Sequence, residues 1–317
     1  MNRPVDLVSQ LQTLLSRKRA SLAGRTTAFR WVDGELDGLT VDCFDDVAVL
    51  SLYREFSPAE EQRLGEALQR AGSCRAVYLK RRPKEARRSA IAAERLAPPR
   101  PIAGEAVEAL TITECGRRFE IRPGNGLSVG LYLDARDARD AVQGAAASGG
   151  RMLNLFAYTC GFGVAAALGG TEETVNVDVS RKVLDWGAAN YELNQLPRER
   201  AKFIADDSFA VLKRLARRGE RFDLIVLDPP SFASTQKSRF SAKTDYGELA
   251  RATFELLAPG GTFFPCVNLA DWTSAQFKRI LEQSLGVAAA FGPPLRASTL
   301  DYGADAAFKA WTVRRSR

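Results

Sequence analysis

The sequence predicts an α/β protein in which a doubly wound, mostly parallel sheet follows a small N-terminal α+β domain. Short apolar runs alternate with helical patterns between about residues 150 and 267, an order typical of parallel strands joined by helices. Acidic residues follow several of these runs. Before residue 105 the pattern differs, because aromatic and β-branched runs are separated by turn residues, as in antiparallel sheets.

The N-terminal part of the chain is predicted to consist of a helix and a small domain. Apolar residues at helical spacing predict a helix within residues 1–24. Residues 25–104 are expected to form the small α+β domain and, over 83–104, a proline-rich linker. The elements expected in this domain are an antiparallel meander, a helix and a further strand, over residues 28–53, 58–72 and 76–79.

Residues 105–317 are expected to form the larger domain, which begins with a β-hairpin that turns at Cys115-Gly116. The predicted parallel strands are 151–155, 174–178, 202–205, 222–227 and 261–267. The helices expected between them lie near 162–169, 181–193, 208–218 and 245–257. In such a sheet the ligand binds beyond the carboxyl ends of the strands.

The composition excludes several classes of chemistry. The chain of 317 residues contains no histidine, which excludes Ser-His-Asp hydrolases, Cys-His proteases and most histidine-ligated metal sites. Its five cysteines are scattered without a CxxC pair, so we expect neither a disulfide framework nor a metal site. The sequence shows no long apolar stretch of the kind found in a signal peptide or membrane helix. We therefore expect a cytoplasmic protein without a membrane partner.

The basic charge of the chain favours an RNA partner. The formal net charge is +7, and Lys and Arg gather around residues 17–19, 80–88 and 213–221. Basic surfaces attract phosphate backbones, although solvated helix faces are the plain alternative. The predicted RNA contacts are Lys80, Arg81, Arg82 and Arg88. The oligomeric state, monomer or homodimer, is left open by the sequence.

Small and acidic residues follow the predicted strands in a defined order. The loop after the first strand contains Gly161, which lets the backbone approach a ligand closely. The second strand ends at Asp178, a position that suits a ribose with both hydroxyls available. Asp206-Asp207 follows the third strand, where a carboxylate can accept a hydrogen bond from adenine, and Asp228 follows the fourth. Each residue alone could be a helix cap, but the ordered set predicts an adenosine site beside a substrate opening.

These motifs resemble those of the bacterial large-subunit rRNA methyltransferase family, which includes the 23S rRNA 5-methylcytosine methyltransferases. The resemblance covers roughly residues 25–317 and is strongest over 127–136, 153–164 and 226–234. It implies a Rossmann-like class I methyltransferase fold, S-adenosylmethionine (SAM) as cofactor, and 23S rRNA or a ribosomal precursor as substrate. The family's rRNA enzymes usually begin with a PUA domain, whereas only a helix precedes the meander here.

The resemblance also implies roles for individual residues. Asp178 would hold the ribose hydroxyls, and Asp207 would lie at the adenine, with Asp206 as the alternative. Asp228 and Pro229 would shape the wall where the methyl donor and the base meet. The other residues expected to contact the cofactor, mainly at its methionine end, are Asp134, Arg136, Phe156, Thr159 and Gly161.

Cys266 is the predicted nucleophile. Methylation of carbon 5 of cytosine requires a thiolate to add to carbon 6, and in the resembling enzymes the nucleophilic cysteine lies on the segment around Cys266. Those enzymes favour serine or threonine beside this cysteine, whereas Pro265 and Val267 flank it here. A buried strand cysteine is the plain alternative. Cys160, where the family usually has glycine, is a second candidate, and Asp228 would act as base.

The leading prediction is therefore a SAM-dependent enzyme that forms 5-methylcytosine in 23S rRNA. Two other functions stay open. The acceptor could instead be a guanine nitrogen, a protein or a small molecule, none of which requires a cysteine. The chain could also be a module that binds SAM and RNA but has lost catalysis.

Overall fold

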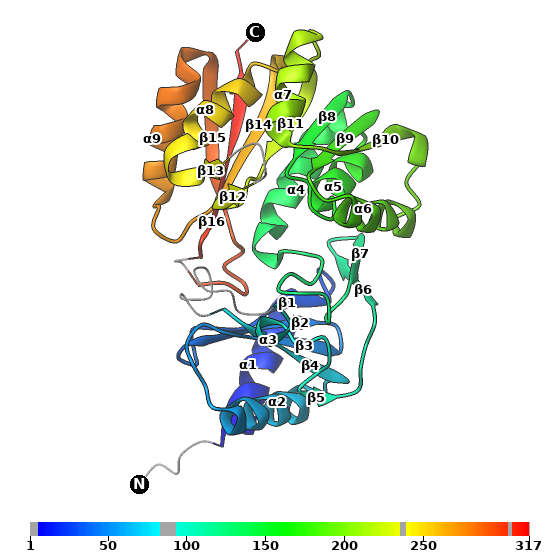
Figure 1. Cartoon of the computed structure of the whole chain (residues 1–317), viewed down its shortest axis with the longest axis vertical. Helices are drawn as coiled ribbons and strands as arrows, with labels where there is room; N and C mark the ends of the chain where they lie inside the picture. Colours follow the sequence, from blue (N-terminus) through cyan, green and yellow to red (C-terminus); the bar gives the residue numbers. More distant parts are fainter. Residues whose placement is uncertain (1–5, 83–92, 235–238, 304–305, 317) are drawn as a thin grey trace. The chain divides into compact units, whose positions relative to one another are not determined.

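A computed structural model describes residues 6–82, 93–234, 239–303 and 306–316. The chain divides into two units, shown in Figure 1, that we describe separately. The first unit consists of Met1–Leu133 and Ser298–Ala304, and the second of Asp134–Ala297 and Asp305–Arg317. The predicted linker over 83–104 and the predicted RNA contact Arg88 fall wholly or partly outside the described residues.

The first unit contains a sheet with the strand order β1-β2-β3-β4-β5. Its strands are β1 (Ala28–Asp33), β2 (Leu39–Phe44), β3 (Val47–Leu52), β4 (Ala76–Arg81) and β5 (Ala103–Gly104). Strands β1 to β3 form the predicted antiparallel meander, while β3 and β4 are parallel. The helices of the unit are α1 (Leu7–Leu22), α2 (Pro58–Gly72) and α3 (Ala93–Leu96). Apolar side chains of α1 and α2 share one core with the sheet.

The hairpin of β6 (Leu110–Glu114) and β7 (Arg117–Ile121) has the predicted turn but belongs to the first unit. Backbone hydrogen bonds attach it there: Thr27 N donates to Thr113 O at 2.9 Å, and Cys115 N donates to Arg25 O at 2.5 Å. The structural boundary therefore falls between Leu133 and Asp134, not at residue 104. The boundaries 1–24, 25–104 and 105–317 were predicted from changes in sequence pattern. Such changes do not reveal the hydrogen bonds between residues 25–27 and the hairpin.

The second unit is a three-layer α/β structure around a sheet with the order β10-β9-β8-β11-β14-β16-β15. Its strands are β8 (Arg151–Leu155), β9 (Glu173–Asp178), β10 (Ala201–Ala205), β11 (Phe222–Leu227), β14 (Leu257–Asn268), β15 (Ala289–Arg296) and β16 (Phe308–Arg315). Strands β10, β9, β8, β11 and β14 are parallel, and β16 is antiparallel to both β14 and β15. The predicted doubly wound, mostly parallel, Rossmann-like sheet is confirmed.

Helices cover both faces of this sheet (Figure 1). The helices are α4 (Arg136–Ala145), α5 (Gly161–Gly169), α6 (Arg181–Leu193), α7 (Ser208–Arg217), α8 (Ala242–Phe254) and α9 (Ser274–Leu285). One core cluster joins α7, α8 and α9 to the sheet through Val211, Leu249 and Leu281. A second cluster joins α4 and α5 to the other face through Val142 and Ala165. A small hairpin, β12 (Phe232–Ser234) and β13 (Arg239–Ser241), lies between β11 and α8 in the sequence.

Short 3₁₀ turns lie at the boundary between the two units and within the second unit. They are η2 (Leu133–Ala135), η3 (Ala146–Ser148), η4 (Arg198–Arg200) and η5 (Gly286–Ala288). Among the described residues, no helix has both the length and the apolar character needed to cross a bilayer.

Candidate functional site

The carboxyl ends of the parallel strands lie along one edge of the large sheet. The register pairs Leu155 with Val177 and Leu227 with Leu155, and it pairs Leu227 with Pro265 on β14. The loops that leave these strands are therefore neighbours. The polar residues at this edge are Asp178 after β9, Asp206 and Asp207 after β10, Asp228 after β11, and Asn268 at the end of β14.

The loop from β8 to α5 has an unusual backbone. Phe156, Tyr158 and Cys160 have φ values of 58°, 47° and 62°, a left-handed conformation that costs a non-glycine residue about 1–2 kcal/mol. Position 160, where the resembling family usually has glycine, thus has the backbone shape that glycine adopts most easily. The three alternating residues bend the chain so that α5 begins directly at Gly161.

Helix α6 supports this loop through a side-chain hydrogen bond and through the close approach of Gly187. Asn190 Nδ2 donates a hydrogen bond of 3.0 Å to the Thr159 carbonyl. A Cβ atom placed on Gly187 would lie 2.4 Å from Cys160 Sγ, so only glycine allows the helix to approach this closely. The loop is consequently fixed by α6 as well as by its own turn geometry.

Asp178 connects the loop to the end of β9. Its Oδ2 accepts a hydrogen bond of 2.9 Å from Tyr158 N, and its Oδ1 accepts one of 3.0 Å from Ser180 N. A carboxylate oxygen accepts about two hydrogen bonds, so each oxygen retains capacity for one more donor. A half-buried carboxylate held in this way fits two adjacent hydroxyl groups.

The two candidates for the adenine contact are both engaged with α7. Asp207 is the N-cap of that helix, and its Oδ1 accepts hydrogen bonds from Phe209 N at 2.8 Å and Ala210 N at 3.1 Å. Asp206 Oδ2 pairs with Arg214 at 2.9 Å. Asp207 therefore caps helix α7. From the sequence, a helix cap was only the general alternative for each of these residues.

Asp228 lies beside a second carboxylate. Burial, and next the neighbouring Asp134, raise the pKa of the Asp228 carboxyl to about 7, while Arg139 opposes the shift. Arg136 and Arg139 of α4 are 1% and 2% exposed. The predicted segment around Asp134 and Arg136 thus contributes acidic and basic groups to the same region as Asp228.

Asn268 is a polar residue of this region that the sequence analysis missed. Its Nδ2 donates a hydrogen bond of 2.9 Å to Asp134 Oδ2, and its carbonyl accepts one of 2.8 Å from Ser231 Oγ. The available signal was its place as the polar residue that ends the apolar run of β14. Asn268 joins the loops after β11 and β14 to Asp134.

The family model described as S-adenosylmethionine-dependent methyltransferase matches residues 19–284. The chain belongs to this methyltransferase family. The S-adenosylmethionine-dependent methyltransferase family that the resemblance implied is therefore confirmed.

Relatives and solved structures agree with this assignment. Ribosomal RNA large subunit methyltransferase I of Aeromonas salmonicida is 36% identical over 257 residues, which cover 80% of this chain and 63% of that protein. SMU.776, described as a methyltransferase and solved in complex with SAH, has a TM-score of 0.85 at 26% identity and covers 99% of this chain and 83% of its own. A structure described as a SAM-dependent methyltransferase from Streptococcus mutans gives a TM-score of 0.83 at 25% identity, with the same coverage.

Cys266 lies near the carboxyl end of β14, one residue beyond the Pro265 that pairs with Leu227, but its side chain is not exposed at this edge of the sheet. Its side chain is 0% exposed and packs in the core cluster of α4 and α5, with Sγ 3.6 Å from the Phe264 carbonyl. Burial, and next the Asp228 carboxylate, raise the pKa of the thiol well above its ordinary value. Cys160 is also 0% exposed, and burial likewise raises its pKa. The thiolate is the nucleophilic form, and burial disfavours this form at both cysteines.

The remaining predicted cofactor residues lie in or beside the β8–α5 loop and the β11 loop. Phe156 stacks on Phe240, with ring centroids 6.4 Å apart. Thr159 is 1% exposed, Gly161 is the first residue of α5, and Pro229 is buried. None of the described residues forms a group of three or more Cys, Asp or Glu side chains that could hold a metal ion.

The predicted RNA contacts in the first unit are only partly accessible. Lys80 is 0% exposed and donates a hydrogen bond of 2.7 Å to the Pro123 carbonyl, so its ammonium group is not available to a phosphate. Arg81 pairs with Glu61 at 2.5 Å, and Arg82 donates to the Leu127 carbonyl at 2.5 Å. The contact predicted for Lys80 is wrong in this structure, because β4 directs that side chain inward.

Proposed function

We propose that this chain transfers a methyl group from SAM to a base of large-subunit rRNA. The observation that supports this most is the gathering of Asp178, Asp228 and the strained loop at one edge of the parallel sheet. The chain spans about 63% of the length of the curated rRNA methyltransferases that it matches. The activity and the RNA acceptor are therefore proposals for this chain.

The residues present fit SAM. Asp178 has acceptor capacity for the ribose hydroxyls, and the backbone of the β8–α5 loop lies beside it. Asp134 and Asp228 would place negative charge near the cationic end of the cofactor. When bound, SAM supplies an electrophilic methyl group on a sulfonium. The chain would orient that group, with Asp206 or Asp207 at the adenine and with Arg136, Phe156, Thr159, Gly161 and Pro229 lining the remaining surface.

For the acceptor atom, the geometry supports a base nitrogen better than carbon 5 of cytosine. Carbon 5 requires a thiolate, and the thiol of Cys266 is buried. A nitrogen needs only polar groups that orient it and a group that accepts its proton. Asn268 and Ser231 supply polar groups beside Asp228, whose pKa is about 7, a value suited to accepting a proton near neutral pH. Formation of 5-methylcytosine stays a prediction that requires Cys266 to become exposed.

The test is methyl transfer from isotopically labelled SAM to purified rRNA, followed by mass spectrometry of the nucleosides. Wild type and Cys266→Ala should both produce the same methylated nucleoside, with methyl on nitrogen. A 5-methylcytosine product that is lost in Cys266→Ala, while SAM binding persists, would restore the thiol mechanism. SAM and RNA binding without any methylated nucleoside would favour the catalytically inactive module instead.

A further inference from the structure

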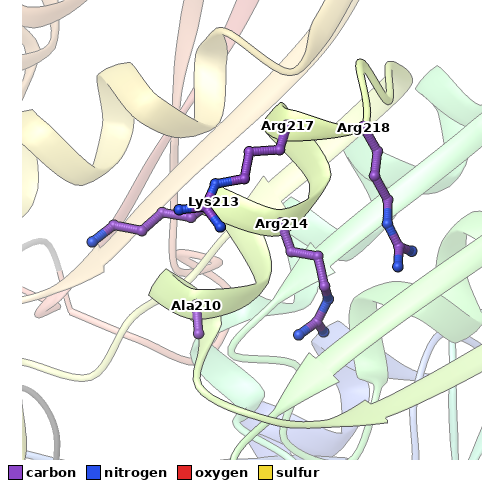
Figure 2. A pocket seen from close by; sticks show the side chains of 5 residues that line it. All are labelled: Ala210, Lys213, Arg214, Arg217 and Arg218. Atoms are coloured by element: carbon purple, nitrogen blue, oxygen red, sulfur yellow. The ribbon is translucent and has the colours of Figure 1, made fainter.

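The outer face of α7 carries a cluster of cations. Lys213, Arg214, Arg217 and Arg218, together with Ala210, line an open hollow of about 410 Å³. Lys213 lies one helical turn before Arg217, and Arg214 lies one turn before Arg218, so the cations form two neighbouring pairs along the helix. In Figure 2, Lys213 and Arg217 extend to one side of the helix, and Arg214 and Arg218 to the other.

Most of this charge is not neutralised within the described residues. Arg214 pairs with Asp206 at 2.9 Å. The side chains of Lys213, Arg217 and Arg218 are exposed and form no ion pair with any residue that the structure describes. Like charges one turn apart destabilise an isolated helix by a few tenths of a kcal/mol per pair. The negative end of the helix dipole attracts cations, which explains why basic residues occur in the last turn of α7. It does not explain why four cations line one hollow.

Helix α7 connects the cluster to the edge of the sheet where the parallel strands end and where we propose that SAM binds, which we call the cofactor edge. Asp207 caps the N-terminus of α7, and Asp206 links the edge directly to Arg214. Asp206 N also donates to the Asp178 carbonyl at 3.0 Å. The ten residues of α7 span roughly 15 Å, so the cations lie within a few nucleotides' reach of the proposed adenosine site.

We propose that this face of α7 binds the sugar-phosphate backbone of the RNA acceptor. This inference rests on the proposed function, since it names the surface that would hold the acceptor strand. Four cations around a hollow suit several phosphates of one strand. Phosphate contacts position a nucleic acid without reading its sequence, so the α7 face would contribute affinity, and the edge near Asp228 would select the base.

The experiment uses the full chain and the triple variant Lys213→Gln/Arg217→Gln/Arg218→Gln. Arg214 is left unchanged because its ion pair with Asp206 belongs to the cofactor edge. The matched control is Arg200→Gln/Arg251→Gln/Arg279→Gln, which removes the same charge from exposed side chains outside the cluster. Binding of a fluorescent rRNA transcript is measured by anisotropy between 50 and 300 mM salt, roughly the range over which phosphate contacts weaken.

The cluster variant should bind the transcript at least about 10-fold more weakly at low salt, and its salt slope should fall by about 2, which is the loss of three phosphate contacts. The control should remain within about 2-fold of wild type. Equal losses in the two variants, or no loss in the cluster variant, would overturn the proposal. Competition by poly-aspartate as strong as that by RNA would overturn the assignment to RNA.

SAM calorimetry and methyl transfer separate this inference from the function on which it rests. The cluster variant should bind SAM normally and methylate rRNA with a raised KM and an unchanged kcat. If wild type methylates rRNA and the cluster variant has the same KM, only the α7 assignment fails. If wild type binds SAM but neither binds nor methylates rRNA, the proposed acceptor itself fails.

Discussion

Asn268 donates a hydrogen bond of 2.9 Å to Asp134, and Asp134 in turn helps to raise the pKa of Asp228. The end of β14 is thereby connected to the carboxyl that follows β11. Asn268 thus holds the carboxylate that, after burial, contributes most to raising the pKa of Asp228.

Asp228 should make the stability of the chain depend on pH. Its folded-state pKa of about 7 lies above the ordinary carboxyl value near 4. Its contribution to stability is therefore complete below about pH 4 and is lost as the pH rises through 7, by a few kcal/mol at most. Asp228→Asn should remove this part of the pH dependence. Urea denaturation of both proteins from pH 4 to pH 8 measures the difference, and parallel curves would contradict the assignment.

Asp178→Ala should weaken SAM binding by at least about 10-fold, because a charged acceptor with two hydrogen bonds to hydroxyls is worth 1.5–3 kcal/mol or more. The loss also frees Tyr158 N, which Asp178 now holds. Calorimetry with SAM and with its demethylated product measures the effect. Asp178→Asn, which keeps one acceptor oxygen, should fall between wild type and Asp178→Ala. Unchanged affinity in a folded Asp178→Ala protein would refute the ribose contact.

Asp207→Ala should act mainly on stability. Loss of the N-cap of α7 should reduce the free energy of unfolding by about 1 kcal/mol. Asp207→Ser, which retains a capping oxygen, should restore most of this stability. If the serine variant is stable yet binds SAM much more weakly than wild type, the carboxylate also contacts the adenine; if its SAM affinity is normal, Asp207 is a cap alone.

Gly187→Ala should displace the β8–α5 loop, since the new Cβ would lie 2.4 Å from Cys160 Sγ. Overpacking of this kind costs about 1–3 kcal/mol, and SAM affinity should fall with stability. The double variant Gly187→Ala/Cys160→Gly should recover part of both losses, because it removes the opposing sulfur and places glycine at a φ of 62°. A double-mutant cycle measures the coupling, and purely additive losses would show that the two residues do not oppose each other.

Local patterns in the sequence predicted much of the second unit. The bounds of β8, β11 and α6 match the predictions. Gly150 precedes β8, Asp228 follows β11 and Ser180 precedes α6, and residues of these types commonly mark the ends of strands and helices. The position of β16 could not be predicted, because this strand enters the sheet between β14 and β15 by long-range antiparallel pairing. Within the candidate site, the residues that the sequence indicated are those in which an acidic side chain ends or follows a strand, such as Asp178 and Asp228.

The side-chain environments were harder to predict. The inward direction of Cys266 depends on which face of β14 packs against α4 and α5. The burial of Lys80 depends on a carbonyl 43 residues away in the sequence. Both depend on tertiary packing, which a pattern of neighbouring residues does not contain.

The left-handed backbone at Phe156, Tyr158 and Cys160 has a consequence for hydrogen exchange. Such conformations store about 1–3 kcal/mol each, so opening this segment releases energy that opening an ordinary turn would not. Its amides should consequently exchange with deuterium ahead of those in the adjoining strand. A nucleoside seated against the segment would close that opening route, and the resulting protection would report occupancy without any chemical turnover.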